Sequence, residues 1–174
     1  NVTTKALLAV LALSTAACTN PNRFGGTGGD TGGQAVAPVT PVAPPLTGAK
    51  DPNSPQYFSQ TIGDRVLFVV DSSTLTAAGQ ATLDGQARWL ASNSDYLAII
   101  EGHADEQGTR EYNLALGARR ANAVREYLTS KGVSSNRLRT ISYGKERPIE
   151  VCATEACYSK NRRAVTIISV GGTS

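Results

Sequence analysis

The sequence predicts an α/β sandwich in which two helices pack on one face of a small mixed sheet. Four short runs rich in β-branched and aromatic residues and two amphipathic segments follow one another as strand, helix, strand, helix, strand and strand, all after residue 56. With 174 residues, 40% of them hydrophobic, the chain is long enough for one ordinary domain and short for two. We therefore expect one core, built from residues 57–174.

The first strand and the first helix have clear boundaries. Residues 65–70, RVLFVV, lie between Gly-Asp and Asp-Ser-Ser and predict a buried strand. Thr76 is placed to cap the following helix, whose apolar face repeats at Leu83, Ala87 and Leu90. A second strand is predicted over residues 96–100 and continues into residues 101–103.

The longest predicted element is a helix from about Thr109 to Lys131, with Gly132 as its C-terminal cap. Its buried stripe is expected at Leu114, Ala118, Ala121 and Leu128. Residues 137–143 and 163–170 supply two further strands, each followed by glycine. Right-handed crossovers place the loop after the second strand and the start of the long helix at one edge of the sheet.

The N-terminal residues have the composition of an export signal followed by a lipid-attachment site. Lys5 precedes an apolar run over residues 6–13, and small residues then lead to Cys18, so residues 1–17 are predicted to be a signal peptide. Small residues before a cysteine resemble the lipobox of bacterial lipoproteins, which predicts acylation of Cys18, although Thr15 stands where leucine is usual. The alternative is an ordinary signal peptide followed by an incidental cysteine.

Residues 18–56 are predicted to be a disordered tether that begins at the lipidated cysteine. Seven of the eight prolines and seven of the 17 glycines lie between residues 19 and 56. Such a segment has too few large apolar side chains to bury a core. A lipid on Cys18 would join this tether to a membrane.

Charge and hydropathy exclude two classes of function. The net charge of +3 is too small for a protein that wraps nucleic acid, and no apolar run reaches the roughly 18 residues that a membrane-spanning helix needs. Residues 101–174 hold twelve basic and eight acidic side chains, so any anion site should lie in this half. A single histidine leaves too few ligands for a recognised metal site.

Cys152 and Cys157 are predicted to form a disulfide, because an exported protein meets an oxidising compartment. In the loop-entropy account, closing so short a ring stabilises the fold by about 2 kcal/mol. We expect the bond to act as a staple in the loop before the last strand.

A polar cluster is predicted at the sheet edge. Asp105 lies in the loop after the second strand, and three residues of the next helix share one face: Asn113, Gly117 and Arg120. In this arrangement a carboxylate and a guanidinium would hold a zwitterion, with Asp105 binding its ammonium group and Arg120 its carboxylate. The alternative is structural: Asp105 is an ordinary loop residue, and Arg120 pairs with Glu101 or Glu106.

Further residues in this region each have two interpretations. His103 either braces the loop or acts as a general acid or base, and without an evident partner nucleophile the first is favoured. Arg162 and Arg163 either contact an anion or, for at least one of them, pair with an acid and fix the last strand. Gly117 inside a helix costs about 1 kcal/mol relative to alanine, which indicates that another group approaches the helix closely there.

Three separated motifs resemble the OmpA-like peptidoglycan-binding domain: EGHADEQGTREYNLALGARRANAVREYL at 101–128, ISYGKERP at 141–148 and SKNRRAV at 159–165. With the predicted anchor and tether in front, the chain resembles the peptidoglycan-associated lipoproteins of the Tol-Pal system. The resemblance implies a βαβαββ domain in which Asp105 and Arg120 hold the diaminopimelate side chain of a peptidoglycan stem peptide. It also implies that the same pocket is lined by Asn113, Leu116, Phe68 and Asp71.

The same resemblance implies a binding protein without a cofactor, and not an enzyme. Such a protein is lipid-anchored in the outer membrane with its domain in the periplasm. It binds peptidoglycan and the Tol system's periplasmic propeller protein, and it supports envelope integrity and outer-membrane constriction in cell division. Val69 replaces the Asp or Asn usual at its position, so a surface module with a vestigial pocket stays open as an alternative. A wall-cleaving enzyme is the other, with acid and base chosen from Glu101, Asp105 and Glu106.

Overall fold

The computed structural model of this chain describes residues 48–170, and every structural statement below concerns those residues. The predicted signal peptide, Cys18 and most of the predicted tether lie outside this range. Among the helices within it, none combines the length and the apolar character needed to cross a bilayer.

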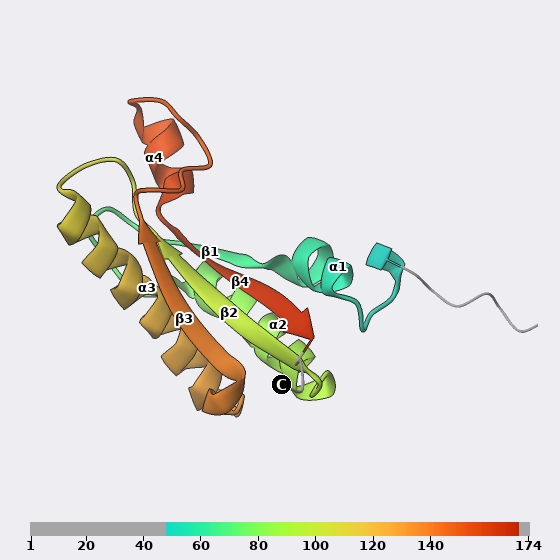
Figure 1. The fold of residues 1–174 in the computed structure, drawn as a ribbon. Helices are drawn as coiled ribbons and strands as arrows, with labels where there is room; N and C mark the ends of the chain where they lie inside the picture. Colours follow the sequence, from blue (N-terminus) through green and yellow to red (C-terminus); the bar gives the residue numbers. More distant parts are fainter. Residues whose placement is uncertain (1–47, 171–174) are drawn as a thin grey trace, which may run out of the picture. The chain divides into compact units, whose positions relative to one another are not determined.

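A four-stranded mixed sheet forms the centre of the fold (Figure 1). Its strands are β1 (Arg65–Leu67), β2 (Tyr96–His103), β3 (Leu138–Gly144) and β4 (Arg163–Val170), in the spatial order β1-β4-β2-β3. β2 runs parallel to β3 and antiparallel to β4, which also pairs antiparallel with β1. The two long helices, α2 (Ala77–Ser92) and α3 (Arg110–Ser130), pack on one face, which confirms the predicted fold class.

The core lies between the sheet and these two helices. Thr76 caps α2 by accepting the Gly79 N–H at 3.1 Å, as predicted. The predicted apolar face of α2 is buried, at Leu83, Ala87 and Leu90. It packs with apolar side chains of the strands and α3, among them Val66, Ala98, Ile100, Val124, Leu128 and Ala164.

α3 buries only part of the stripe that its apolar residues predict. Its limits agree with the prediction, because Thr109 caps the Tyr112 N–H at 3.2 Å and Gly132 follows the helix with a φ of +94°. Ala121 and Leu128 are buried as expected, but Leu114 is 40% exposed and Ala118 is only partly buried. The full set of buried residues is Asn113, Leu116, Gly117, Arg120, Ala121, Val124 and Leu128. The two polar side chains of this face are buried because both find hydrogen-bond partners in neighbouring loops.

The first strand is shorter and more exposed than the sequence predicts. A buried strand is expected over residues 65–70, but β1 ends at Leu67 and lies at the edge of the sheet. Val69 and Val70 are 57% and 55% exposed. Beyond Leu67 the backbone carbonyl groups accept hydrogen bonds from arginine side chains, which turns the chain away from the sheet.

Three short helical elements precede β1: η1 (Gly48–Lys50), α1 (Pro55–Tyr57) and η2 (Phe58–Gly63). Phe58 packs against Trp89 of α2 with ring centroids 5.0 Å apart, and the Trp89 indole donates to the Pro52 carbonyl at 2.7 Å. Residues 48–56 therefore pack with the domain, although their composition assigns them to the tether. They do so because the side chain of Trp89 offers both an apolar surface and a hydrogen-bond donor.

A short helix, α4 (Glu155–Asn161), precedes β4 where the sequence predicts only a loop. A disulfide joins Cys152, before this helix, to Cys157 within it, with Cα atoms 5.8 Å apart. A single turn, η3 (Ser135–Arg137), leads into β3. The disulfide thus holds the first turn of α4 in a small covalent ring.

α3 and β2 touch backbone to backbone at two glycines. A Cβ atom added at Gly117 would lie 2.4 Å from Ser142 Oγ and 2.8 Å from the Gly102 carbonyl oxygen. A Cβ atom added at Gly102 would lie 1.8 Å from the Gly117 carbonyl oxygen. The close approach that a glycine inside this helix predicts is therefore made by the sheet itself.

Replacing Gly117 by alanine should lower the free energy of unfolding by about 2–3 kcal/mol, because the added methyl group meets backbone that cannot move aside. The matched control is Gly85→Ala in α2, where the nearest atom to the added Cβ is the Ile62 methyl carbon Cγ2, at 3.2 Å. Urea unfolding measures both variants. Equal losses in the two variants would contradict the backbone contact.

Candidate functional site

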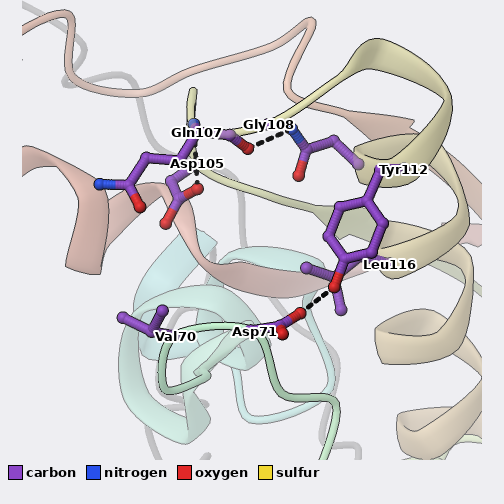
Figure 2. Close-up of a pocket in the computed structure, with 8 residues that line it drawn as sticks. Val70, Asp71, Asp105, Gln107, Gly108, Tyr112 and Leu116 are labelled. Carbon is purple, nitrogen blue, oxygen red and sulfur yellow. Dashed lines mark hydrogen bonds between the residues drawn. The ribbon is translucent and has the colours of Figure 1, made fainter.

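A cavity of about 250 Å³ opens at the end of the sheet where β2 leads into α3 (Figure 2). Three segments line it: the turn after β1, the loop after β2 and the first two turns of α3. The lining residues are Val70, Asp71, Asp105, Gln107, Gly108, Tyr112, Asn113 and Leu116. Four of these are predicted site residues, so the polar edge expected from the sequence lies at a hollow in the surface.

Asp105 supplies a carboxylate that is largely buried but lines the cavity. Its Oδ1 accepts the Gln107 N–H at 3.2 Å, and its Oδ2 lies 3.1 Å from Arg162 Nη1. Just before it, the Ala104 N–H donates to the Gly144 carbonyl at 2.8 Å, which ties the loop to β3. The carboxylate is thus held in place from two sides while lone pairs remain for a ligand.

Asp71 supplies a second carboxylate from the opposite side of the cavity. Its backbone has a φ of +53°, a left-handed conformation that aspartate tolerates better than most residues. Its Oδ1 accepts a hydrogen bond from the Tyr112 hydroxyl, which raises the pKa of Tyr112 (Figure 2). The turn after β1 is thereby fastened to the first turn of α3.

Asn113 shapes the loop after β2, and Leu116 makes the apolar part of the cavity. The Asn113 side chain is buried, and its Nδ2 donates to the Gln107 carbonyl at 2.7 Å. Gly108 follows with a φ of +89°. Leu116 is 4% exposed and lies one helical turn further along α3. The cavity therefore combines two carboxylates and amide groups with an aliphatic surface.

Arg120 is wholly buried and does not line the cavity. Its guanidinium donates to three backbone carbonyls: Ser72 at 2.8 Å, His103 at 2.8 Å and Val69 at 3.2 Å. The predicted alternative, an ion pair with Glu101 or Glu106, is wrong, because backbone oxygens take its donors. Burial lowers the pKa of Arg120 to about 10, so the group still carries its charge at neutral pH.

Phe68 and Val69 contribute to the site indirectly. Phe68 does not line this cavity: its side chain is buried in the core, with its ring centroid 5.2 Å from Arg120 Cζ. Val69 does not line the cavity either, although its carbonyl accepts from Arg120. Valine in place of the usual Asp or Asn at position 69 is therefore not part of the wall of this cavity.

The two arginines before and at the start of β4 have structural partners. Arg162 pairs with Asp105 and with Glu155, which confirms that at least one of the two contacts an acid. Arg163 donates to the carbonyls of Asn161 at 3.3 Å and Arg147 at 3.1 Å. These two arginines thus contact neighbouring segments, and neither of them lines the cavity.

His103 is buried at the end of β2 and does not line the cavity. Its Nε2 lies 3.4 Å from Glu101 Oε2, but neither ring nitrogen makes a hydrogen bond within the described residues. Burial, followed by the positive charges of Arg163 and Arg147, lowers its pKa to about 4. The neutral ring lies against Tyr143, with centroids 5.7 Å apart, so it braces the strand end. No group of three His, Cys, Asp or Glu side chains in residues 48–170 is placed to hold a metal.

Sequence reasoning misses four of the lining residues: Val70, Gln107, Gly108 and Tyr112. Helical spacing is a signal for one of them, since Tyr112 lies four residues before Leu116 and therefore on the same face of α3. The other three lie in turns and loops. Their positions depend on the path of the backbone, which no spacing pattern fixes.

Comparisons with known proteins identify the family to which this chain is similar. The sequence model of the OmpA family matches residues 67–162. A peptidoglycan-associated lipoprotein of Rhizobium meliloti is 59% identical over 125 residues, which cover 72% of this chain and 71% of the relative. One of Brucella melitensis is 47% identical over 167 residues, which cover 96% of this chain and 92% of the relative.

Solved structures share the fold. The crystal structure of the peptidoglycan-associated lipoprotein from Burkholderia pseudomallei matches with a TM-score of 0.62 and 39% identity, covering 70% of this chain and 98% of that one. The C-terminal domain of Helicobacter pylori MotB matches with a TM-score of 0.58 and 23% identity, covering 62% of this chain and 85% of that one. The second match shows a common fold alone.

Acidification should destabilise the protein through His103. Its pKa is about 4 in the folded state and about 6.5 in an unfolded chain, so protonation favours unfolding. The stabilisation is complete above about pH 6.5 and is lost as the pH falls toward 4, by up to about 3 kcal/mol. Urea unfolding at pH 7, 6, 5 and 4 measures it. In the variant His103→Gln the free energy of unfolding should change less steeply with pH. The same slope in the variant and the wild type would refute the role of His103 in this pH dependence.

Arg120→Lys should lower the free energy of unfolding by about 2–3 kcal/mol, because an ammonium group keeps the charge but cannot reach three carbonyls at once. Its exposed neighbour provides the control: Arg119→Lys should change stability by less than about 0.5 kcal/mol. Thermal and urea unfolding compare the two. If both variants are as stable as the wild type, the carbonyl contacts do not hold the segments together.

Proposed function

The chain belongs to the OmpA family, with peptidoglycan-associated lipoproteins among its relatives, and we propose that it binds peptidoglycan noncovalently through the cavity beside α3. The observation that carries this proposal is the Asp105 carboxylate, anchored by Arg162 and the Gln107 N–H at the wall of that cavity. An anchored carboxylate with free lone pairs is suited to bind an ammonium group.

The ligand we propose is the diaminopimelate side chain of a stem peptide. It carries an ammonium group and a carboxylate at the end of a short methylene chain. Asp105 would bind the ammonium group, with Asp71 adding negative charge from the opposite wall. Leu116 and Val70 would contact the methylene groups, and Asn113 would keep the loop in shape.

The role that we propose for Arg120 rests on the resemblance and on its buried position behind the cavity wall. The resemblance assigns it to the ligand's carboxylate, yet three carbonyls enclose its guanidinium here. Direct contact would require the turn at Val69 and Ser72 to release it. In the arrangement that this structure shows, Arg120 holds the walls of the cavity together, and Asp105 binds the ammonium group of the ligand.

Binding is better supported than cleavage of the wall. Of the three carboxylates considered as acid and base, only Asp105 lines the cavity. Glu101 lies beside His103, and Glu106 Oε1 accepts a hydrogen bond from Asn161 at 2.6 Å. An acid and a base acting on one bond must both face the substrate. None of the acid–base pairs that can be chosen from Glu101, Asp105 and Glu106 is therefore assembled at the cavity.

Attachment to the outer membrane is the second part of the proposal. The match to the Brucella melitensis lipoprotein leaves only 4% of this chain uncovered, so it includes Cys18. We propose that Cys18 is acylated, that residues 19–47 span from the membrane toward the wall, and that the domain faces the periplasm. Binding to the Tol system's propeller protein and a role in cell division rest on the resemblance alone.

Asp105→Asn should weaken binding of a diaminopimelate stem peptide by at least about tenfold, because the neutral amide loses the ion pair with the ligand's ammonium group. Calorimetric titration of the full chain in detergent measures this, with the lysine-containing peptide as a ligand that lacks the distal carboxylate. The control variant is Asp95→Asn at an exposed site before β2. Unaltered affinity in folded Asp105→Asn would remove this residue from the site.

Incubation with purified peptidoglycan separates binding from cleavage. The wild type should sediment with the intact polymer, and Asp105→Asn should stay in the supernatant. Release of soluble fragments by the wild type would instead support the enzyme.

A further inference from the structure

Arg162 lies between two carboxylates, one at the cavity and one on the surface. Its Nη1 is 3.1 Å from Asp105 Oδ2 and 3.2 Å from Glu155 Oε2, and its Nη2 pairs with Glu155 Oε1. Its Nε donates to the Phe68 carbonyl at 3.2 Å. The Arg162 side chain is 5% exposed, whereas that of Glu155 is 65% exposed. A surface carboxylate and a cavity carboxylate therefore share one buried guanidinium.

The disulfide fixes the place of Glu155. This residue begins α4, and Cys152 and Cys157 bracket it. Cys157 is buried and Cys152 is exposed, so the bond ties a surface segment to the domain. An exposed carboxylate on a free loop gains little from an ion pair, because ordering the loop costs conformational entropy. Covalent closure reduces that loss and keeps Glu155 against Arg162.

Glu155 alters how much of the negative charge of Asp105, and how many of its lone pairs, are available in the cavity. A buried guanidinium requires compensating charge, and here two carboxylates provide it. Pairing with Arg162 lowers the pKa of Glu155, so Glu155 is ionised at neutral pH. Without Glu155, Arg162 would depend on Asp105 alone, and that carboxylate would have less charge and fewer lone pairs left for a cation.

We propose that the disulfide-closed loop at residues 152–157 is a positioning element of the cavity, in which Glu155 acts through Arg162 to set how strongly Asp105 binds an ammonium group. Glu155 does not line the cavity, so its effect is indirect. The identity of the ligand rests on the proposed function. The coupling between Glu155 and Asp105 rests on the contacts themselves.

The test is a titration of the full chain with two stem peptides, whose diaminopimelate side-chain amine is free in one and acetylated in the other. In Glu155→Gln the free-amine peptide should bind about three- to tenfold more weakly, whereas affinity for the acetylated peptide should not change. The double variant Cys152→Ser, Cys157→Ser should change in the same direction, because Glu155 is then free to leave Arg162.

Glu150→Gln is the matched control. Glu150 lies on the same connection between β3 and β4, but it pairs with Lys160 at 3.0 Å on the surface. This variant should bind both peptides as the wild type does. Wild-type affinity in Glu155→Gln would overturn the inference. An equal loss for both peptides would do so too, because it would indicate general damage to the fold.

A second measurement without ligand separates this inference from the proposed function. The Gln107 N–H donates to Asp105 Oδ1, so its NMR signal reports on that carboxylate. Glu155→Gln should shift the signal and Glu150→Gln should leave it in place; an unmoved signal in Glu155→Gln overturns the coupling. If the wild type binds neither peptide while the signal moves, the proposed function fails and the coupling stands.

Discussion

One buried guanidinium organises the end of the sheet where the cavity lies. Arg120 has no exposed surface, and in residues 48–170 no carboxylate lies within ion-pair distance of it. A charge buried in this way needs dipoles around it, and three backbone carbonyls supply them. The turn after β1 must therefore reach the end of β2, and this brings Asp71 to the same hollow as Asp105.

Features with local signals are predictable from the sequence, whereas features that depend on distant partners are not. Thr76 and Thr109 cap their helices, and β-branched and aromatic residues mark the strands, two of which are followed by glycine. The apolar pattern does not predict that Arg120 of α3 is buried, because the carbonyls that it contacts include that of Ser72, far away in the chain. Residues 48–56 likewise pack with the domain through a contact to Trp89, which composition does not reveal.

In the candidate site, too, the sequence predicts which residues take part but not all of the contacts that they make. The motifs bring Asp105, Asn113 and Leu116 to the cavity as expected, since they lie on one loop and one helix face. The surplus of basic residues assigns any anion site to this half but does not show what lines a cavity there: the cavity wall has carboxylates, and Arg120 and Arg162 are buried. Net charge counts residues, whereas recognition depends on which of them reach the surface. A shared fold, such as that with the Helicobacter pylori MotB domain, does not show which side chains of this chain bind a ligand.

The contact of Trp89 with residues 48–58 has a mechanical consequence. It joins the N-terminal segment to the end of α2, close to Tyr96 at the start of β2, whereas the cavity lies beyond the other end of that strand. A pull between the chain before Gly48 and a ligand at Asp105 therefore acts along the strands. Trp89 and Asp105 lie just before and just after β2 in the chain, so the covalent backbone of this one strand joins the two points of attachment and would carry the load.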